Sequence, residues 1–255
     1  MNTNNLLIDF ITEFDATANL GDCFAVLEKA VEKLGFSAIA YTLIPVGLNA
    51  LESNNPIFLA SANFSKDFLG HYAGENFAAD DFTIKRILNG NLKPMDWWQE
   101  ERKGLLLERE KRVIQTAKTD YAINNGLSIP MLSSPQHIAG ASIISEENGA
   151  HFGLLLEERL ALLRAIITLF HHRVYGNFEY RKAFYSAIVN KLTDREKRVL
   201  QFLVIGQPYK AMDNRYGMSA SAAANARSDL FRKFAVKNAS ELAYLAGLHN
   251  LIEML

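Results

Sequence analysis

Residues 192–217 read LTDREKRVLQFLVIGQPYKAMDNRYG, and this stretch decides the fold of the C-terminal part of the chain. Thr193 and Glu196 have the spacing of a capping box, in which each side chain binds a free backbone N–H at the start of a helix. Apolar residues follow at helical spacing, and Gly206 is placed to end this helix. The pattern predicts two further helices, the first of which ends by Tyr216. A helix-turn-helix of this kind is typical of modules that lay one helix in a groove of DNA.

The composition allows two folded domains. The chain has 255 residues, of which 49% are hydrophobic, so each half can bury a core. Its net charge of -1 argues against a wholly basic nucleic-acid-binding protein. Residues 186–255 contain ten Lys or Arg and six Asp or Glu, a net charge of +4, which leaves -5 on residues 1–185. A mildly basic tail on an acidic body fits a DNA-contacting domain attached to a second domain.

Cysteine content and hydropathy indicate the compartment. Cys23 is the only cysteine, which excludes disulfides within the chain and makes a cysteine-based zinc site implausible. The N-terminus lacks the basic start and apolar core of a secretory signal, and no apolar run approaches the roughly 20 residues that span a bilayer. We therefore expect a soluble cytoplasmic protein with no membrane partner.

Periodicity along residues 1–175 predicts helices on both sides of a mainly antiparallel sheet. The expected strands are 37–45, 57–60, 127–131 and 138–145. The expected helices are 22–34, 64–90 in two pieces with a break at 76–81, 99–125 with a buried stripe of Leu105–Leu107 and Val113, and one from Glu157 onward. Pro130 lacks an N–H, which places its strand at an edge or a bulge. The predicted class is α+β, with an N-terminal α/β/α sandwich (1–175), a linker (176–190) and a C-terminal all-α helix-turn-helix domain (191–255).

The C-terminal residues resemble the DNA-binding module of the LuxR family of transcription factors. The resemblance rests on Leu192-Thr-x-Arg-Glu-x-x-Val-Leu, Gly206, Lys210, Gly217, Phe231-Arg-Lys and Val236-x-Asn. It implies that the helix from Ser219 to Phe234 is the recognition helix and that the protein regulates transcription.

The N-terminal half resembles the signal-binding domain of LuxR-type quorum-sensing regulators. The residues that carry this second resemblance, in chain order, are Phe68, Tyr72, Asp81, Trp97, Gly126, Pro130 and Ser142. It implies an α/β/α sandwich that encloses an acyl-homoserine lactone as autoinducer. No other cofactor is expected.

The resemblance implies a role for each matching position. Tyr72 would hydrogen-bond the amide carbonyl of the signal, and Asp81 would accept its amide N–H. Trp97 would form the wall beside the lactone ring, and Ser142 would place a hydroxyl near the start of the acyl chain. Gly126 would serve the backbone entering its strand. A mostly apolar pocket with a few fixed polar groups suits such a ligand.

The sequence departs from the family pattern at three points. At Phe68 the family has tryptophan, whose indole N–H donates to the lactone carbonyl, and phenylalanine has no donor. Phe82 replaces the usual proline after Asp81. The spacing from Asp81 to Trp97 is one residue longer than usual, so Trp98 is an alternative equivalent. The departures favour a carbonyl- or amide-bearing metabolite of partly apolar character, an acyl-homoserine lactone or a related compound.

The recognition helix is rich in alanine where the family has longer side chains. Alanines stand at positions 222, 223, 224 and 226. The expected base contacts are Ser221, Asn225 and Arg227. The expected phosphate contacts are Lys210, Arg232 and Lys233. Two alternatives stay open: a working regulator with relaxed site preference, or a degenerate relative with weak DNA binding that acts as a signal sink or inhibitory dimer partner.

The apolar faces of two helices bear on dimerisation. The resemblance implies a homodimer through the last helix and the long helix from Glu157, although packing within the domain explains the same apolar residues. Those of the last helix are Leu242, Leu245, Ala246 and Leu248.

No nucleophile elbow, phosphate loop or His-Glu-x-x-His motif is present, so no enzyme is expected. His171 and His172 point about 100° apart on a helix, which predicts surface or interface histidines and no metal site.

Overall fold

The computed structural model describes residues 3–48, 56–131, 134–147, 149–207, 212 and 217–255. The chain divides into two compact units, which are described separately. The first unit comprises residues 1–44, 55–134 and 138–181. The second comprises residues 45–54, 135–137 and 182–255.

A five-stranded sheet in the order β2-β1-β5-β4-β3 forms the centre of the first unit. Its strands are β1 (Ala38–Pro45), β2 (Phe58–Ala60), β3 (Met95–Asp96), β4 (Asn125–Pro130) and β5 (His137–Ser145). The pairs β1–β2, β3–β4 and β4–β5 are antiparallel. The register of β4 against β5 places Ser128 opposite Ser142, so two hydroxyls lie side by side on one face of the sheet.

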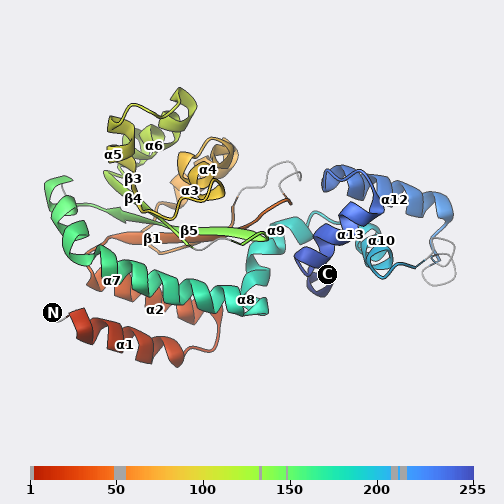
Figure 1. Cartoon of the computed structure of the whole chain (residues 1–255), viewed down its shortest axis with the longest axis horizontal. Helices are drawn as coiled ribbons and strands as arrows, with labels where there is room; N and C mark the ends of the chain where they lie inside the picture. The colour runs from red at the N-terminus through yellow and green to blue at the C-terminus, as the bar shows by residue number, and fades with distance from the viewer. Residues whose placement is uncertain (1–2, 49–55, 132–133, 148, 208–211, 213–216) are drawn as a thin grey trace. The chain divides into compact units, whose positions relative to one another are not determined.

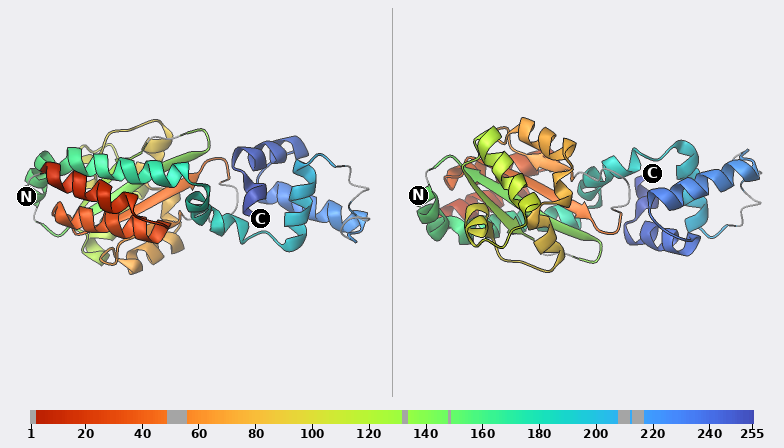
Figure 2. Two further views of the ribbon diagram at one scale, coloured as in Figure 1. Left: turned by 90° about the horizontal axis from the view of Figure 1, so that it is seen from below. Right: turned by 90° about the horizontal axis from the view of Figure 1, so that it is seen from above.

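Helices cover both faces of this sheet (Figure 1). One face carries α1 (Thr3–Asp15), α2 (Leu20–Lys33) and α7 (Gly149–Gly176). The other carries α3 (Lys66–Gly74), η1 (Phe77–Ala79), α4 (Phe82–Leu88), α5 (Trp97–Arg102) and α6 (Glu108–Tyr121). Figure 2 shows the two helical layers from opposite sides. The predicted α/β/α sandwich on an antiparallel sheet is confirmed.

Three local predictions for the first unit are wrong. The helix expected over 99–125 is two helices, because the chain turns at Gly104 with a φ of +70°. This turn leaves Leu105 and Leu107 exposed, while Leu106 and Val113 are buried. Helix α7 begins at Gly149, eight residues earlier than expected.

Pro130 occupies the end of β4, where it pairs with Gly140 of β5. The strand is not at the edge of the sheet, because β3 lies outside it. However, β3 pairs only with Leu127 and Ser128 and stops short of Pro130. The missing N–H therefore falls where the outer strand has already ended.

Helix α7 packs its apolar face against the sheet. His171 lies on that face and is buried, with its Nδ1 atom 2.8 Å from the hydroxyl of Tyr41. His172, one residue on, is exposed. The prediction of a surface or interface position is therefore wrong for His171. Within the described residues, no helix is long and apolar enough to cross a membrane.

The second unit is helical. Its elements are η2 (Ala183–Tyr185), α9 (Ser186–Val189), α10 (Asp194–Val204), α12 (Ala220–Lys233), α13 (Ala239–Leu248) and α14 (Leu251–Met254). Helix α8 (Phe178–Lys182) spans the division between the units. The expected linker 176–190 is thus largely helical. The short helix expected up to Tyr216 lies largely outside the described residues.

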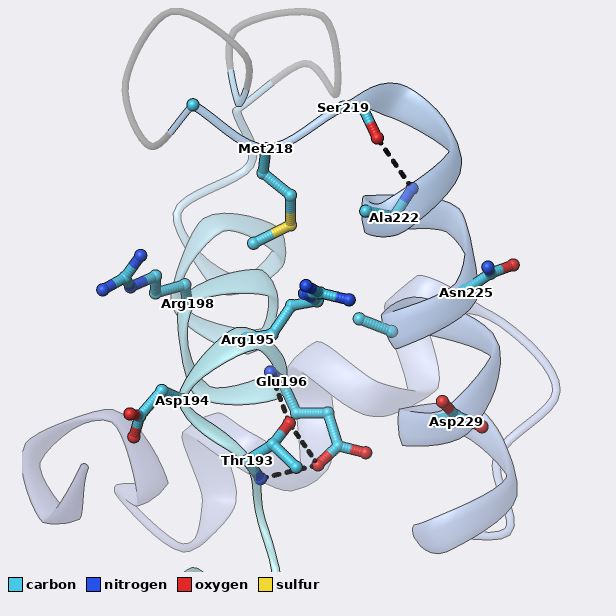
Figure 3. Close-up of a pocket in the computed structure, with 12 residues that line it drawn as sticks. Thr193, Asp194, Arg195, Glu196, Arg198, Met218, Ser219, Ala222, Asn225 and Asp229 are labelled. Atoms are coloured by element: carbon cyan, nitrogen blue, oxygen red, sulfur yellow. Dashed lines mark hydrogen bonds between the residues drawn. The ribbon is translucent and has the colours of Figure 1, made fainter.

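The helix starts and ends predicted from the sequence of the second unit are seen in its hydrogen bonds and backbone angles. The Thr193 N–H donates to Oε2 of Glu196 at 2.7 Å, and the Glu196 N–H donates to the Thr193 hydroxyl at 3.2 Å. This is the predicted capping box (Figure 3). Gly206 follows the end of α10 with a φ of +73°, and the Ser219 hydroxyl accepts the N–H of Ala222 at the start of α12.

Candidate functional site

A small cavity in the first unit gathers all five residues predicted to bind a ligand. Its volume is about 40 Å³, and it is lined by residues of the sheet and of the helices α3–α6. Phe68 and Tyr72 come from α3, Asp81 from the N-cap of α4, Trp97 from the start of α5 and Ser142 from β5. Side chains from four elements therefore meet at one cavity.

A second cavity of about 30 Å³ adjoins the first. The two share the residues Ala40, Phe58, Tyr72, Asp81, Thr83 and Ser142. The first cavity is otherwise lined by three rings, those of Phe64, Phe68 and Trp97, and by three aliphatic side chains, whereas the second has no further ring and is lined mainly by aliphatic side chains such as Ile84 and Ile87. The site thus has one half that holds most of the rings, here called the aromatic half, a second half that is mainly aliphatic, and a polar centre whose residues line both halves.

Asp81 is the hub of the polar centre. Its Oδ1 atom accepts the backbone N–H and the hydroxyl of Thr83, each at 2.7 Å. Its Oδ2 atom accepts the hydroxyl of Tyr72 at 2.9 Å. A carboxylate offers about four acceptor positions, so these three bonds leave room for one more donor. Asp81 caps α4 and keeps the capacity to bind a ligand N–H.

Tyr72 is held as a hydrogen-bond donor. Burial raises the pKa of its hydroxyl well above the ordinary tyrosine value, and the charge and hydrogen bond of Asp81 raise it further. The hydroxyl therefore stays protonated. Its ring meets those of Phe58 and Phe68 edge to face, at centroid distances of 5.6 and 6.0 Å. These contacts fix the direction in which the hydroxyl points.

Trp97 forms one wall of the aromatic half. Its indole N–H donates to the Ser128 hydroxyl at 2.9 Å, and that hydroxyl lies 3.5 Å from the one of Ser142. Trp98 lines neither cavity and donates its indole N–H to the carbonyl of Asn124. Of the two tryptophans, Trp97 therefore lines the candidate site and Trp98 does not.

Gly126 leaves space for the ring of Trp97. A Cβ atom built on Gly126 would lie no farther than 2.6 Å from three carbons of the Trp97 ring. The inferred role in the backbone entering the strand does not describe this contact, because the φ angle of Gly126 is not in the left-handed region. Glycine is required here by the ring that lies against it.

Phe68 is buried and fills the position where the family has tryptophan. Its ring packs against Tyr121 at a centroid distance of 5.5 Å. The hydroxyl of Tyr121 is 2.8 Å from Nδ1 of His71. This part of the wall is an aromatic cluster, and Phe68 offers no hydrogen bond to a ligand.

Sequence reasoning missed Thr83 and Ser128. Thr83 stands two residues after the helix-capping Asp81, and this spacing is the available sequence signal for it. Ser128 has no such local signal, because its role comes from the strand register that pairs it with Ser142. Both residues support the polar centre.

Ion pairs join the helices above the site. Glu100 of α5 binds Arg86 of α4 at 2.5 Å and Lys103 at 2.7 Å. Burial raises the pKa of Glu100, but the hydrogen bonds from Lys103 and Arg86 lower it by more than burial raises it. The pKa is therefore held below the ordinary glutamate value. Lys85 of α4 likewise binds Glu110 of α6 at 3.0 Å. Among the described residues, no three His, Cys, Asp or Glu side chains group closely enough to hold a metal ion.

In the second unit, α12 presents part of the predicted DNA-contact set to solvent. Ser221, Asn225 and Arg232 are exposed on one stripe, to which Ser228 also belongs. Arg232 also pairs with Asp229 of the same helix at 2.8 Å. Sequence reasoning missed Ser228, although its spacing from Ser221 and Asn225 places it on the same helix face.

The other three predicted DNA contacts are not shown exposed on this stripe. Arg227 is half-buried, with its guanidinium over the ring of Phe231. Lys233 donates to Glu196 at 2.7 Å and to the carbonyl of Lys191 at 2.8 Å, so its ammonium serves the packing of the unit. Lys210 lies outside the described residues.

Helix α13 contributes to the core of the second unit. Leu242 and Ala246 are fully buried there, whereas Leu245 and Leu248 are half-exposed. Packing within the unit therefore explains two of the four apolar residues of this helix.

Comparison with protein families identifies the first unit. Residues 19–174 match the autoinducer binding domain family, which is more than half of the chain. The chain belongs to this family. The resemblance to LuxR-type proteins is confirmed, and the family is one of non-enzymatic signal receptors. The matched region ends before α10–α14, so the helix-turn-helix assignment rests on the motifs of the sequence and the helices of the second unit.

Solved structures show the same fold. The crystal structure of Escherichia coli SdiA is 13% identical with a TM-score of 0.52, over 98% of this chain and 99% of that chain. A structure of SdiA in complex with octanoyl-rac-glycerol is 13% identical with a TM-score of 0.50, over 99% and 97%. At this identity the likeness concerns the fold alone. Among curated proteins, none matches the sequence.

Proposed function

We propose that this autoinducer-binding protein is a cytoplasmic, homodimeric transcriptional regulator of the LuxR type, whose first unit binds an acyl-homoserine lactone or a related amide-bearing metabolite. The observation that carries the proposal is the polar centre of Tyr72, Asp81 and Thr83, which lines both the cavity that holds most of the rings and the mainly aliphatic cavity. Such a division matches a ligand with a compact head, a central amide and an apolar tail.

The polar centre has the groups that an amide needs. The remaining acceptor position of Asp81 would take the amide N–H, and a bond to a charged acceptor is stronger than one to a neutral acceptor. The hydroxyl of Tyr72, which donates to Asp81 in the structure, would turn to the amide carbonyl. The head would lie beside Trp97 and the tail among the isoleucines of the second cavity.

The site must open to admit such a ligand. Its two cavities, of about 40 and 30 Å³, each hold about one water molecule. Pockets for drug-sized ligands occupy roughly 300–1,000 Å³. Binding would therefore favour a conformation in which the α3–α6 layer stands farther from the sheet. A signal can shift the protein toward a DNA-binding state only if it prefers one conformation.

The head group is the part of the signal that Phe68 affects. Without an indole N–H at this position, a buried lactone carbonyl lacks one donor, at a cost of about 1–3 kcal/mol. The proposal therefore includes ligands whose head needs no donor there. Expected affinities for lactones are weaker than those of a site with tryptophan.

The recognition helix supports the regulatory role. Ala223 and Ala226 are buried in the second unit, and a longer side chain at the fully buried Ala223 would face the core. Only Ala222 and Ala224 are partly accessible. Only two of the four alanines therefore stand where a longer side chain could reach a base. This favours a working regulator with a relaxed preference among DNA sites over the degenerate relative.

Isothermal titration calorimetry of the full-length protein tests the ligand. The injected panel pairs acyl-homoserine lactones of several tail lengths with N-acyl amides that lack the lactone ring. We expect tail-dependent binding that weakens in Tyr72→Phe and in Asp81→Asn. Absence of binding by every member of both series would refute the ligand class, and equal affinity in the variants would refute the polar centre as the site.

A further inference from the structure

Two helices of the first unit supply walls of the candidate site and meet each other. Phe68, Leu69 and Tyr72 of α3 line the first cavity, and so do Val113 and Ile114 of α6. The two helices cover the same face of the sheet (Figure 1) and pack against each other. Their line of contact, here called the seam, therefore separates two walls of the ligand cavity.

A hydrogen bond and an ion pair cross the seam. Nδ1 of His71 on α3 lies 2.8 Å from the hydroxyl of Tyr121 at the end of α6. Arg112 of α6 donates to Glu75, the C-cap of α3, at 2.6 Å. The ring of Tyr121 also packs against Phe68, at a centroid distance of 5.5 Å. Because Phe68 is buried and Tyr121 is half-buried, a route from solvent through the seam meets Tyr121 first and the cavity wall second.

The seam is held less firmly than the contacts of α4 in the same layer. Ion pairs join α4 to Glu100 of α5 and to Glu110 of α6, and these two side chains are only 10% and 12% exposed. The ion pair of Arg112 and Glu75 is 62% and 44% exposed. Breaking a buried pair is costly, whereas a pair in water contributes little to stability. Opening along the seam is therefore the easier movement of this layer.

A bond from α3 to α4 lies inside the site. Tyr72 donates to Asp81, which caps α4. In the proposed function, the Tyr72 hydroxyl turns to the amide carbonyl of the ligand and Asp81 accepts the amide N–H. An arriving amide thus compensates for this bond. Tyr121, in contrast, lines neither cavity, so its bond to His71 remains a cost of opening that the ligand does not offset.

We propose that the ligand enters the site between α3 and α6, and that the hydrogen bond of Tyr121 to His71 is the latch that controls this route. The inference rests on the proposed ligand-binding function and adds the way in to that site. The two cavities, of about 40 and 30 Å³, each hold about one water molecule, so the closed form admits no ligand. The rate of entry then follows the fraction of molecules in which the latch is open.

Hydrogen exchange of the two indole N–H groups tests the opening without a ligand. The chain has two tryptophans, so isotope labelling of tryptophan gives one NMR signal for each indole. The indole N–H of Trp97 binds Ser128 at the site, whereas that of Trp98 binds the carbonyl of Asn124. Exchange at Trp97 requires water to enter the site, and its rate therefore reports the open fraction. Trp98 is the internal control in every sample.

Three variants of the full-length protein are compared with wild type. Tyr121→Phe keeps the ring and removes the latch, and Arg112→Gln removes the exposed ion pair of the seam. The matched control is Lys29→Gln, which breaks an exposed ion pair with Glu13 between α2 and α1 on the other face of the sheet.

We expect exchange at Trp97 to be about fivefold faster in Tyr121→Phe, the effect of one ordinary hydrogen bond. The increase should be smaller in Arg112→Gln, because the pair is exposed. Exchange at Trp98 should keep its wild-type rate, and Lys29→Gln should change neither indole. An unchanged rate at Trp97 in Tyr121→Phe overturns the inference, and so does an equal acceleration of both indoles, which would report general loosening.

Stopped-flow fluorescence with N-octanoyl-homoserine lactone tests the route itself. We expect the association rate constant to rise several-fold in Tyr121→Phe and to stay at the wild-type value in Lys29→Gln. A lactone that binds wild type and Tyr121→Phe at the same rate overturns the route while the proposed function stands. Absence of binding by wild type, for this lactone and for N-octanoyl amides without the ring, refutes the proposed ligand class and the ligand route with it.

Discussion

The ring of Trp97 lies against Gly126 and occupies the space in which a side chain at that position would begin. This contact joins the start of α5 to β4, and the indole N–H of Trp97 reaches Ser128 two residues along the strand. One glycine therefore sets the depth of a wall of the candidate site.

Substitution of Gly126 by alanine should destabilise the first unit. The added methyl group must displace the Trp97 ring or the strand, and overpacking of this kind costs about 1–3 kcal/mol. Urea unfolding of the purified protein measures the change. Gly153→Ala is the control, because nothing lies within 4 Å of its added carbon and alanine favours its helix. If Gly126→Ala is as stable as wild type, the packing of Trp97 described above is wrong.

The Tyr72–Asp81 bond should appear as a coupling energy. Tyr72→Phe removes the donor, and Asp81→Asn removes the charge while an asparagine can still cap α4. Because each single change breaks the same bond, the double variant should be more stable than additivity predicts, by about 1 kcal/mol. Denaturant unfolding of the four proteins gives this number. Strict additivity would show that the two side chains do not interact.

The Glu196–Lys233 pair should stabilise the second unit at neutral pH. Burial raises the pKa of Glu196, but hydrogen bonds from Lys233 and Thr193 outweigh it and hold the pKa below the ordinary value. A lowered carboxyl pKa contributes stability above the ordinary value of about 4.3 that is lost as the pH falls through the folded pKa.

Lys233→Met should therefore cost about 3 kcal/mol at pH 7, and less in acid, where wild type has lost the same contribution. Thermal unfolding against pH measures both quantities. The exposed pair of Arg232 and Asp229 supplies the control, since Arg232→Ala should change stability by less than about 1 kcal/mol. A Lys233→Met deficit that is small at pH 7, or that grows in acid, contradicts this account of the pair.

Phe68→Trp should restore the donor missing from the aromatic wall. One recovered hydrogen bond is worth about 1.4 kcal/mol, or tenfold in affinity. The gain should appear for acyl-homoserine lactones and not for N-acyl amides without the ring, as measured by calorimetry. An equal gain for both series would assign the effect to packing and not to the indole N–H.

The sequence was sufficient for residues that follow a local pattern. Thr193 and Glu196 occupy the capping box that their spacing predicts. The order of Phe68, Tyr72 and Asp81 led to one cavity because a family resemblance carries three-dimensional information that spacing alone does not.

Non-local contacts could not be predicted in the same way. Gly126 has an ordinary backbone conformation, so only the ring of Trp97 explains it. Lys233 is far from Glu196 in sequence, and its ion pair depends on how α12 packs on α10. The two-residue strand β3 and the turn at Gly104 are too short to produce a periodic signal.

The most direct test of the central claim is thermal unfolding of the full-length protein with a panel of acyl-homoserine lactones and N-acyl amides. Ligand at a hundred times its dissociation constant adds about 2.7 kcal/mol, which raises the unfolding temperature by roughly 5–10 °C for a domain near this size. The account predicts such a shift in wild type, dependent on tail length and reduced in Asp81→Asn. A folded sample that shows no shift with any member of the panel, or an equal shift in Asp81→Asn, would contradict it.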